Sequence, residues 1–461
     1  MRESISPWYI TKVVTKETHH IKLMRRRIYM NEYFVAYEPN LKCYPNYSFE
    51  IGDINGDGRM EMVSLNQNGN KLRVVDLDGK KLFEQVISNN GNWGTPLICI
   101  TDIDKDGRGE IIVPSFGPKF EARIIAFNAE GKIIREHSFG IYSKDDYGIG
   151  VPLLAPMCFH KNQPGIIAAI AGGYLAALDA NLCEVWRVNN FRHDFAHEFY
   201  ITDIDDDGLD EVAFCTLDHA HGKLRGDWNI GEIVILDHDG TTLLRRRVEE
   251  YYHDTHFDDI AMADFRGIGR TEILLEKGIL IDLNGNVIWD VSDQFDHAQW
   301  IAHTPNPQGK GRLIFISELW GSEGKSALFS GEGKKLWDIK NLPRTRLDQK
   351  KFLGWKVLPT RCHIVRWTEK SDPEIFLAEQ THSPTGPNCL STIYFELKAF
   401  FLNLNGKLLG TLPFTDAQIE NYWYNGECHS RVADVDGDGQ QEVVFPRQDG
   451  HVAVIKKHIR N

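Results

Sequence analysis

The chain has 461 residues, 42% of them hydrophobic and 25% charged, which is enough for one large repeat architecture or for two to three ordinary domains. Its formal net charge is −13, and this argues against nucleic acid as a partner because phosphate binding needs a basic surface. No segment approaches 18 apolar residues, and MRESISPWYI at the start has no apolar run of signal-peptide length. We therefore expect no membrane contact and a cytoplasmic location, or secretion if a signal peptide has been removed.

An acidic phrase recurs along the chain and divides it into units. It reads DINGDGRMEM from Asp53, DIDKDGRGEI from Asp102, DIDDDGLDEV from Asp203 and DVDGDGQQEV from Asp434, with a degenerate copy, DFRGIGRTEI, from Asp264. Three more segments, near residues 157, 304 and 366, keep the apolar strand pattern without the acids. The eight anchors near 53, 102, 157, 203, 264, 304, 366 and 434 lie about 40 to 68 residues apart, which suits one four-stranded blade plus loops.

A hairpin turn alternates with the acidic phrase. It appears in VVDLDGKKL, AFNAEGKII, ILDHDGTTL and LFSGEGKKLW, where Gly falls at the position that needs positive φ, while ALDANLCEVW lacks the Gly. Each unit then reads as strand, acidic loop, strand, connection, strand, glycine turn and strand. We predict an all-β fold, a single β-propeller domain over residues 1–461 with eight blades of four antiparallel strands; a seven-bladed ring with one repeat as an excursion is the alternative.

The two ends of the chain complement each other. The last unit stops after HVAVIKKH without its outermost strand, and IYMNEYFVAYE before the first anchor offers a spare one. We expect the N- and C-terminal strands to pair and close the ring, because closure removes exposed sheet edges.

The four complete acidic phrases fit D-x-[DN]-x-D-G-x-x-E, a density of oxygen ligands that suits Ca²⁺. The alternative is a metal-free turn rich in Asp and Asn, and the copy at Asp264, with Arg266 and Ile268 at positions 3 and 5, should bind no metal because Arg266 would replace the cation. We predict several calcium ions, mainly structural. Their ligands would be Asp53, Asn55, Asp57 and Glu61; Asp102, Asp104, Asp106 and Glu110; Asp203, Asp205, Asp207 and Glu211; and Asp434, Asp436, Asp438 and Glu442.

The acidic repeat resembles the FG-GAP or VCBS-type repeat of integrin α-chain heads, over nearly the whole chain. The blade lengths and the aromatic- and His-rich strand starts are similar to those of propeller polysaccharide lyases, including the eight-bladed rhamnogalacturonan lyases and the lyases of ulvan and of rhamnosyl-glucuronate linkages. This resemblance implies a lyase that cleaves a uronate-containing, rhamnose-linked oligosaccharide or polysaccharide by β-elimination.

Polar residues gather just before the innermost strands. Since the acidic loops follow these strands, the residues before them should ring the axial channel on the opposite face. The catalytic candidates are His197, Tyr252, His256, His429 and Arg431, and the substrate-binding candidates are Tyr147, His193, Glu198, His297, Trp300, Arg361 and Trp423. A single His before a strand is more often a turn or surface residue, and a Trp here more often packs between blades, but His recurs in five blades.

β-Elimination from a uronate would use these residue types. His or Tyr can act as base and acid near neutral pH, and Arg can pair with the carboxylate. Glycoside hydrolysis would instead need two carboxylates, which Glu198, Asp258, Asp259 and Glu427 offer. A non-catalytic propeller that binds sugar or protein is the third possibility, and it has little need of several His residues around the axis.

Overall fold

The computed structural model describes most of the chain. The described residues are 32–41, 49–66, 70–87, 98–117, 121–141, 151, 153–161, 163–170, 174–189, 191, 194–217, 231–252, 257, 259–296, 298–318, 324–348, 350–352, 355–382, 393–418, 430–447 and 449–459.

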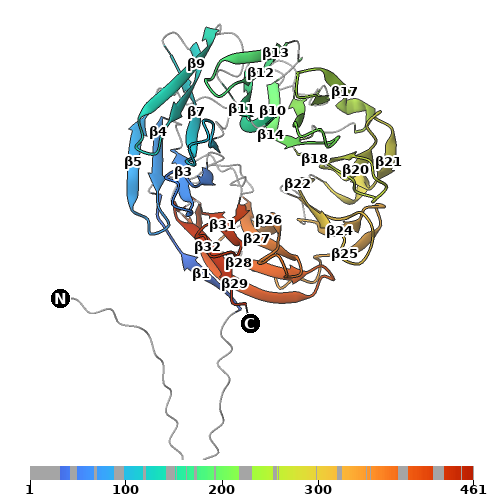
Figure 1. Ribbon diagram of the computed structural model, residues 1–461. Helices are drawn as coiled ribbons and strands as arrows, with labels where there is room; N and C mark the ends of the chain where they lie inside the picture. The colour runs from blue at the N-terminus through green and yellow to red at the C-terminus, as the bar shows by residue number, and fades with distance from the viewer. Residues whose placement is uncertain are drawn as a thin grey trace, which may run out of the picture.

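Eight four-stranded antiparallel sheets form a ring around a central axis (Figure 1). Blade 1 holds β2 (Phe49–Gly52), β3 (Glu61–Leu65), β4 (Lys71–Val75) and β5 (Lys81–Val86); blade 2 holds β6 (Cys99–Thr101), β7 (Glu110–Phe116), β8 (Glu121–Phe127) and β9 (Ile133–Ile141); blade 3 holds β10 (Leu153–His160), β11 (Gln163–Ile170), β12 (Tyr174–Leu178) and β13 (Glu184–Val188). Blade 4 holds β14 (Asp194–Thr202), β15 (Glu211–Leu217), β16 (Glu232–Leu236) and β17 (Thr242–Arg247); blade 5 holds β18 (Ile260–Ala263), β19 (Glu272–Leu275), β20 (Ile279–Ile281) and β21 (Val287–Asp290). Blade 6 holds β22 (Ala298–Pro305), β23 (Arg312–Glu318), β24 (Ser326–Ser330) and β25 (Lys335–Asp338); blade 7 holds β26 (Lys356–Val365), β27 (Glu374–His382), β28 (Ile393–Asn403) and β29 (Leu408–Gln418); blade 8 holds β30 (Arg431–Ala433), β31 (Glu442–Pro446), β32 (Val452–Lys457) and β1 (Tyr33–Tyr37).

The predicted fold class is confirmed, and eight sheets exclude the seven-bladed alternative. Helical structure in the described residues is limited to two short 3₁₀ segments, η2 (Val248–Glu250) and η3 (Ser292–Gln294). None of the helices in that part of the chain has the length and apolar character needed to cross a membrane.

The ring closes through the pairing of β1 with β32, as predicted. The register runs antiparallel from Tyr33 opposite Lys457 to Val35 opposite Ile455, and the blue N-terminal strand lies against the red C-terminal one in Figure 1. Tyr33 also stacks on Phe401 of blade 7, with ring centroids 3.7 Å apart, and donates a hydrogen bond to Glu374. The closing strand is therefore fixed to blade 7 by side chains as well as to blade 8 by its backbone.

The hydrophobic core lies between neighbouring blades, because each sheet packs against two others. All residues of β3 and of β16 are buried, including the Glu that begins each strand, and most of them are apolar. One buried cluster joins Ile167 of blade 3 to Phe214 of blade 4, and the next joins Ile235 of blade 4 to Ile273 of blade 5.

The glycine turns have a packing role as well as a conformational one. Gly333 has φ of 75°, as the turn pattern predicted, and Trp289 of the preceding blade covers it so closely that a Cβ would lie 2.8 Å from the indole. The indole Nε1 of Trp289 donates to the carbonyl of Gly331 at 2.9 Å. The turn without Gly is completed by Leu182, which adopts φ of 58°.

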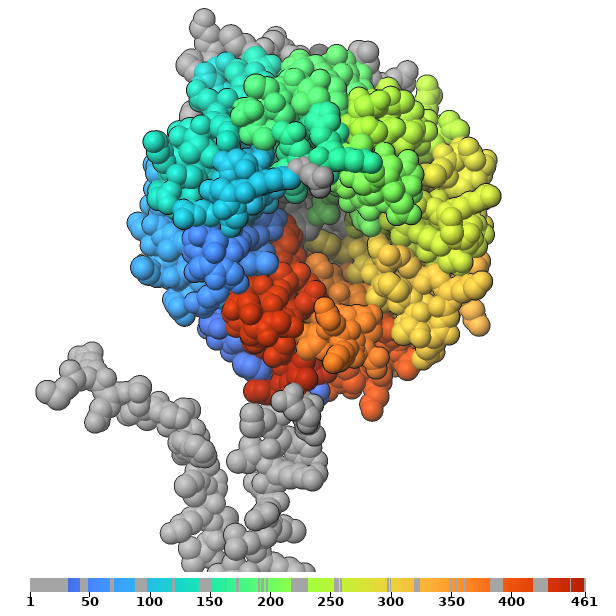
Figure 2. Space-filling view, in the orientation of Figure 1, coloured from blue at the N-terminus to red at the C-terminus, as the bar shows by residue number. Residues whose placement is uncertain are grey.

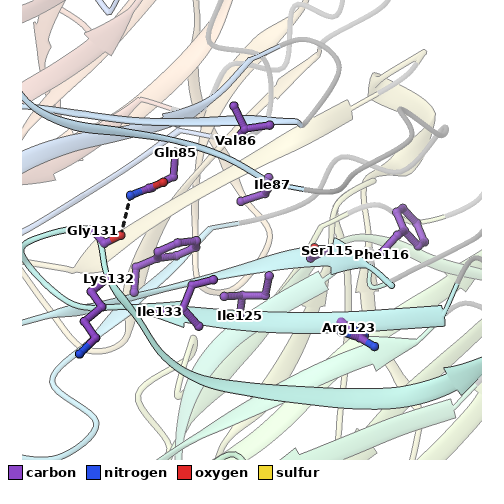
Figure 3. A pocket seen from close by; sticks show the side chains of 11 residues that line it. Gln85, Val86, Ile87, Ser115, Phe116, Arg123, Ile125, Gly131, Lys132 and Ile133 are labelled. Atoms are coloured by element: carbon purple, nitrogen blue, oxygen red, sulfur yellow. Dashed lines mark hydrogen bonds between the residues drawn. The ribbon is translucent and has the colours of Figure 1, made fainter. Parts of the chain in front are cut away.

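Similar hydrogen bonds, from a side chain of one blade to a backbone carbonyl in the turn of the next, join other pairs of blades. Trp186 donates to the carbonyl of His238, Trp337 to that of Leu404, and Gln85 to that of Gly131, the contact drawn in Figure 3. The outermost strand of one blade therefore holds the glycine turn of the next at several places around the perimeter.

Candidate functional site

The acidic loops lie between the first and second strands of their blades, all on one face of the ring. In blade 1 the first carboxylate closes the loop: Asp53 accepts hydrogen bonds from the backbone N–H groups of Gly56 at 2.7 Å and Gly58 at 2.9 Å. The same contact, from the glycine at position 6 to the first Asp, recurs in blades 2, 4, 5 and 8 at 2.7–2.9 Å. The loops thus share one backbone shape.

The acid at position 9 of each loop is a buried Glu at the start of the second strand. Glu61 is 2% exposed and accepts a hydrogen bond from the N–H of Ile54. Burial, with a smaller contribution from Asp57 and Asp53, raises the pKa of Glu61 to about 7. Burial likewise raises the pKa of Glu211 to about 7. A buried carboxylate among other carboxylates is a place where a cation would be favourable.

The donor atoms converge in these loops. In blades 2, 4 and 8 the acids at positions 1, 3 and 9 each bring one oxygen within 4.8 Å of the others; these are Asp102, Asp104 and Glu110, Asp203, Asp205 and Glu211, and Asp434, Asp436 and Glu442. In blade 1 position 3 is Asn55, whose Nδ2 donates to Glu61. Oxygen donors at this density fit Ca²⁺.

Three of the five loops are contacted by a protein cation. In blade 2 the guanidinium of Arg135 lies 3.3 Å from the position 3 acid, Asp104. In blade 5 the guanidinium of Arg266 pairs with the position 9 acid, Glu272, at 2.5 Å, as expected for a loop that does without metal. In blade 8 the ammonium of Lys456 lies 2.7 Å from Asp436 and 2.6 Å from Asp438.

On the opposite face, charged side chains gather where the innermost strand of blade 5 begins. Glu276 and Lys277 lie in the turn after β19, both with fully buried side chains, and the Lys277 ammonium is 3.6 Å from Glu276. Glu276 accepts the backbone N–H of Asp259 at 3.0 Å. The Lys277 ammonium is 5.8 Å from the ring centroid of Tyr252, so the cluster includes one predicted catalytic residue.

Asp259 connects this cluster to both neighbouring blades. Its carboxylate accepts the N–H of Ile301 on β22 at 3.0 Å, and Glu198 on β14 is close enough to act on it electrostatically. Protein atoms surround the carboxylate although the residue keeps some solvent exposure. Burial and the negative charges of Glu198 and Glu276 raise the pKa of Asp259 well above its usual range, so it is a candidate proton carrier.

A second polar chain connects blades 4 and 6. Tyr200 on β14 contacts Nε2 of His303 on β22 at 3.3 Å, and Arg312 contacts Nδ1 of His303 at 3.1 Å. Because a guanidinium can only donate, Nδ1 must accept and His303 carries its proton on Nε2. Burial and the charge of Arg312 lower the pKa of His303 to about 4, which keeps it neutral at physiological pH.

The structure places several predicted site residues in definite contacts. Tyr252 and Glu198 belong to the cluster around Asp259. Arg431 on β30 forms a two-pronged ion pair with Glu50 on β2, Nε and Nη2 each 2.9 Å from a carboxylate oxygen, and so joins blades 8 and 1. Trp300 packs against the core cluster between blades 6 and 7, which agrees with the packing alternative.

The other candidates lie wholly or partly outside the described residues. His197 is on β14 and Arg361 on β26, but their side chains are outside the described part of the structure. Tyr147, His193, His256, His297, Trp423 and His429 are outside it altogether. Their roles stay predictions.

Sequence reasoning missed part of this polar set. Glu276 and Lys277 are adjacent charged residues directly after EILL. Charged residues are also expected where a strand ends at a solvated surface, so this pair did not indicate a site. Glu318 ends the second strand of blade 6, and Glu379 lies in the last part of the second strand of blade 7. Each accepts a backbone N–H from the incoming connection, from Asp296 and Thr345 respectively. This recurrence of an acid at or near the end of the second strand was the available signal.

Hollows are present at the axis and at the perimeter. Figure 2 shows the ring around a central hollow. A cavity of about 530 Å³ lies at the perimeter between blades 1 and 2, lined by Gln85, Phe116, Arg123 and Ile133 among others (Figure 3). It is away from the innermost strands and from the cluster around Asp259.

Comparison with known proteins supports the fold. Residues 53–113 match the FG-GAP-like repeat. No curated protein matches the sequence. Among solved structures, the exotype rhamnogalacturonan lyase YesX is 16% identical with a TM-score of 0.62, covering 93% of this chain and 76% of that one. A Bacillus licheniformis rhamnogalacturonan lyase is 15% identical with a TM-score of 0.55, covering 90% and 72%. Saccharomyces cerevisiae Sqt1 is 11% identical with a TM-score of 0.54, covering 93% and 98%. At these identities the likeness establishes a propeller fold.

Proposed function

We propose that the chain is a carbohydrate-active propeller that cleaves a uronate-containing, rhamnose-linked glycan by β-elimination. The observation that carries this proposal is the cluster around Asp259, in which charged and titratable side chains of blades 4 and 5 meet at the start of the innermost strands. Titratable groups with displaced pKa values are typical of catalytic sites. The likeness in fold to rhamnogalacturonan lyases is consistent with this chemistry.

The cluster can supply the groups that the reaction needs. The C5–H bond breaks and its proton passes to a base, the C4–O bond breaks, and the leaving oxygen takes up a proton as the C4=C5 double bond forms. Tyr252 and the predicted His256 are candidates for proton transfer. Asp259 lies beside Glu198, and the raised pKa of its buried carboxyl group makes this pair a second place in the cluster where a proton can be held.

We also propose that the acidic loops of blades 1, 2 and 4 bind structural Ca²⁺. The converging carboxylate oxygens of blades 2 and 4 support this assignment, and so does the buried Glu at position 9 in all three loops. When bound, the ion would neutralise the clustered carboxylates and fix the loop between the first two strands of each blade.

The proposed reaction is tested with a panel of uronate-containing oligosaccharides. A rise in ultraviolet absorbance from the new C4=C5 double bond is the expected result. New reducing ends without that absorbance would indicate hydrolysis, for which Glu198 and Asp259 supply two neighbouring carboxyl groups. Binding without either change would contradict catalysis and leave a binding propeller.

A further inference from the structure

A basic groove lies on the same face as the cluster around Asp259. The connection from the outermost strand β25 to the innermost strand β26 runs from the perimeter towards the axis, and residues 340–356 contain six basic side chains and one acid. A cavity of about 810 Å³ opens along it. This cavity is within the size range of carbohydrate and small-molecule sites.

The lining of the groove is positively charged, in contrast to the chain as a whole. Lys340, Arg344, Arg346 and Lys356 line it together with Trp355, and there is no acid among the described residues that line it. The Lys340 ammonium lies 3.6 Å from Asp338, which is outside this lining. A second cavity of about 240 Å³ shares Lys340 and Arg344 and adds Lys325, Lys335 and Asp338. The net charge of the chain is −13, so this groove is a local concentration of positive charge on an acidic protein, which favours the approach of an anion.

The groove is fixed to the body of the ring. The N–H of Thr345 donates to buried Glu379 at 2.6 Å, and Lys398 donates to the carbonyl of Pro343 at 2.9 Å. Trp355 packs on Phe395, with ring centroids 5.1 Å apart. The backbone that presents the cations is therefore held in place before any ligand arrives, which lowers the entropy cost of binding.

We propose that this groove binds the carboxylates of an acidic glycan and leads it from the perimeter to the axis. The proposal rests on the proposed function for the choice of glycan over other polyanions. Arg and Lys side chains pair with carboxylates, and Trp355 provides an aromatic surface beside them for a sugar ring.

The test is binding of an oligogalacturonate to the full chain, measured by calorimetry. Combined Lys340→Gln and Arg346→Gln substitutions should raise the dissociation constant about tenfold. Both side chains are exposed, so folding should be unaffected. The matched control is Lys334→Gln with Lys407→Gln, two exposed lysines on glycine turns at the perimeter, which should bind like the wild type.

Wild-type affinity in the groove variant would overturn the site. Equal affinity of the wild type for single-stranded DNA or polyaspartate would overturn the glycan assignment. If no glycan is cleaved but the groove variant alone loses binding, the proposed reaction fails and the groove stands.

A separate observation concerns the acidic loop of blade 8. The Lys456 ammonium reaches three of its carboxylates, Asp436, Asp438 and, at 3.3 Å, Glu442. The hydroxyl of Tyr37 donates to Asp436 at 2.9 Å. These two groups come from β32 and β1, the strands that close the ring.

In blade 2 the guanidinium of Arg135 reaches one acid of the loop, Asp104, at 3.3 Å, whereas Lys456 reaches three acids of the blade 8 loop. The place that Lys456 occupies holds no cation in blades 1 and 2, because those blades continue differently. The position after the third strand is Asp76 in blade 1 and Asn128 in blade 2, and each caps the glycine turn that follows, accepting the N–H of Lys80 or Lys132. Blade 8 has no glycine turn there, since β32 pairs with the N-terminal strand. The side chain at the corresponding place, Lys456, is therefore available to the loop.

We infer that Lys456 replaces calcium in blade 8, so that the protein holds ions in three acidic loops and not four. A divalent ion at that loop would lie beside the ammonium, and the repulsion between them would weaken its binding. The closing blade is instead held by its own cation and needs no metal to form.

Elemental analysis after calcium loading and desalting tests this inference. Three ions are expected for the wild type, four for Lys456→Met, two for Asp57→Asn in blade 1, and three for Asp438→Asn in blade 8. The last two variants are a matched pair that does not depend on the folding of Lys456→Met. Four ions in the wild type together with three in Asp438→Asn would overturn the inference, and so would an ion-free wild type.

Discussion

Removal of calcium should lower the free energy of unfolding by roughly 8 kcal/mol, if three sites are each kept about 100-fold above their dissociation constants. The physical reason is that the ligands of one ion come together only in the folded loop, so the ion binds the native state alone. Without the ion, each loop leaves a buried Glu, such as Glu61 or Glu211, among neighbouring carboxylates. The measurement is thermal unfolding with calcium and after chelation, with metal removal verified by elemental analysis.

Two loop variants provide the comparison for this experiment. Asp57→Asn removes a ligand in blade 1 and should abolish about a third of the chelator effect. Asp264→Asn alters the degenerate loop of blade 5, where Arg266 already pairs with Glu272, and should leave the chelator effect unchanged. An unfolding temperature that does not change when the metal is gone would refute a structural role for calcium.

Much of the fold could be predicted because the repeat carries two independent signals. The acidic phrase marks the passage from the first strand to the second, and the glycine turn marks the passage from the third to the fourth. Blade 8 lacks its last strand at the C-terminal end of the repeats, and Tyr33–Tyr37 is a spare strand before the first repeat. The pairing of these two ends, which closes the ring, could therefore be predicted. Trp recurs on the outermost strands of blades 3, 5 and 6, but its contact with the turn of the next blade, as between Trp289 and Gly333, could not be predicted because the sequence pattern does not say which blade each Trp meets.

The candidate site was predicted less completely, for a physical reason. Sequence places residues before an innermost strand but cannot say which partner each will meet across the axis. Arg431 was expected to meet a substrate carboxylate, and in the structure its guanidinium pairs with Glu50 of the next blade. Asp259 was considered only as a hydrolase carboxylate. In the structure its backbone N–H meets Glu276 and its carboxylate meets Ile301, two contacts between segments distant in sequence that the repeat pattern does not specify.

Tyr252→Phe should lower kcat on a cleavable uronate by about 100-fold or more while the unfolding temperature changes little. The substitution removes one hydroxyl and keeps the ring that lies beside Lys277 in the cluster. If the hydroxyl carries a proton in the reaction, only the chemical step should suffer, and KM should be almost unaffected.

The adjacent residue is a natural control. Tyr251 donates its hydroxyl to the carbonyl of Gly285 at 2.8 Å, a latch between blades 4 and 5. Tyr251→Phe should therefore lower stability by about 1 kcal/mol and leave kcat unchanged. A Tyr252→Phe protein with wild-type kcat would remove Tyr252 from the mechanism, whereas equal losses of kcat in both variants would point to a general disturbance of blade 5. Opposite responses of two neighbouring tyrosines would locate proton transfer at the cluster around Asp259, because the two hydroxyls differ in the partner that each one meets.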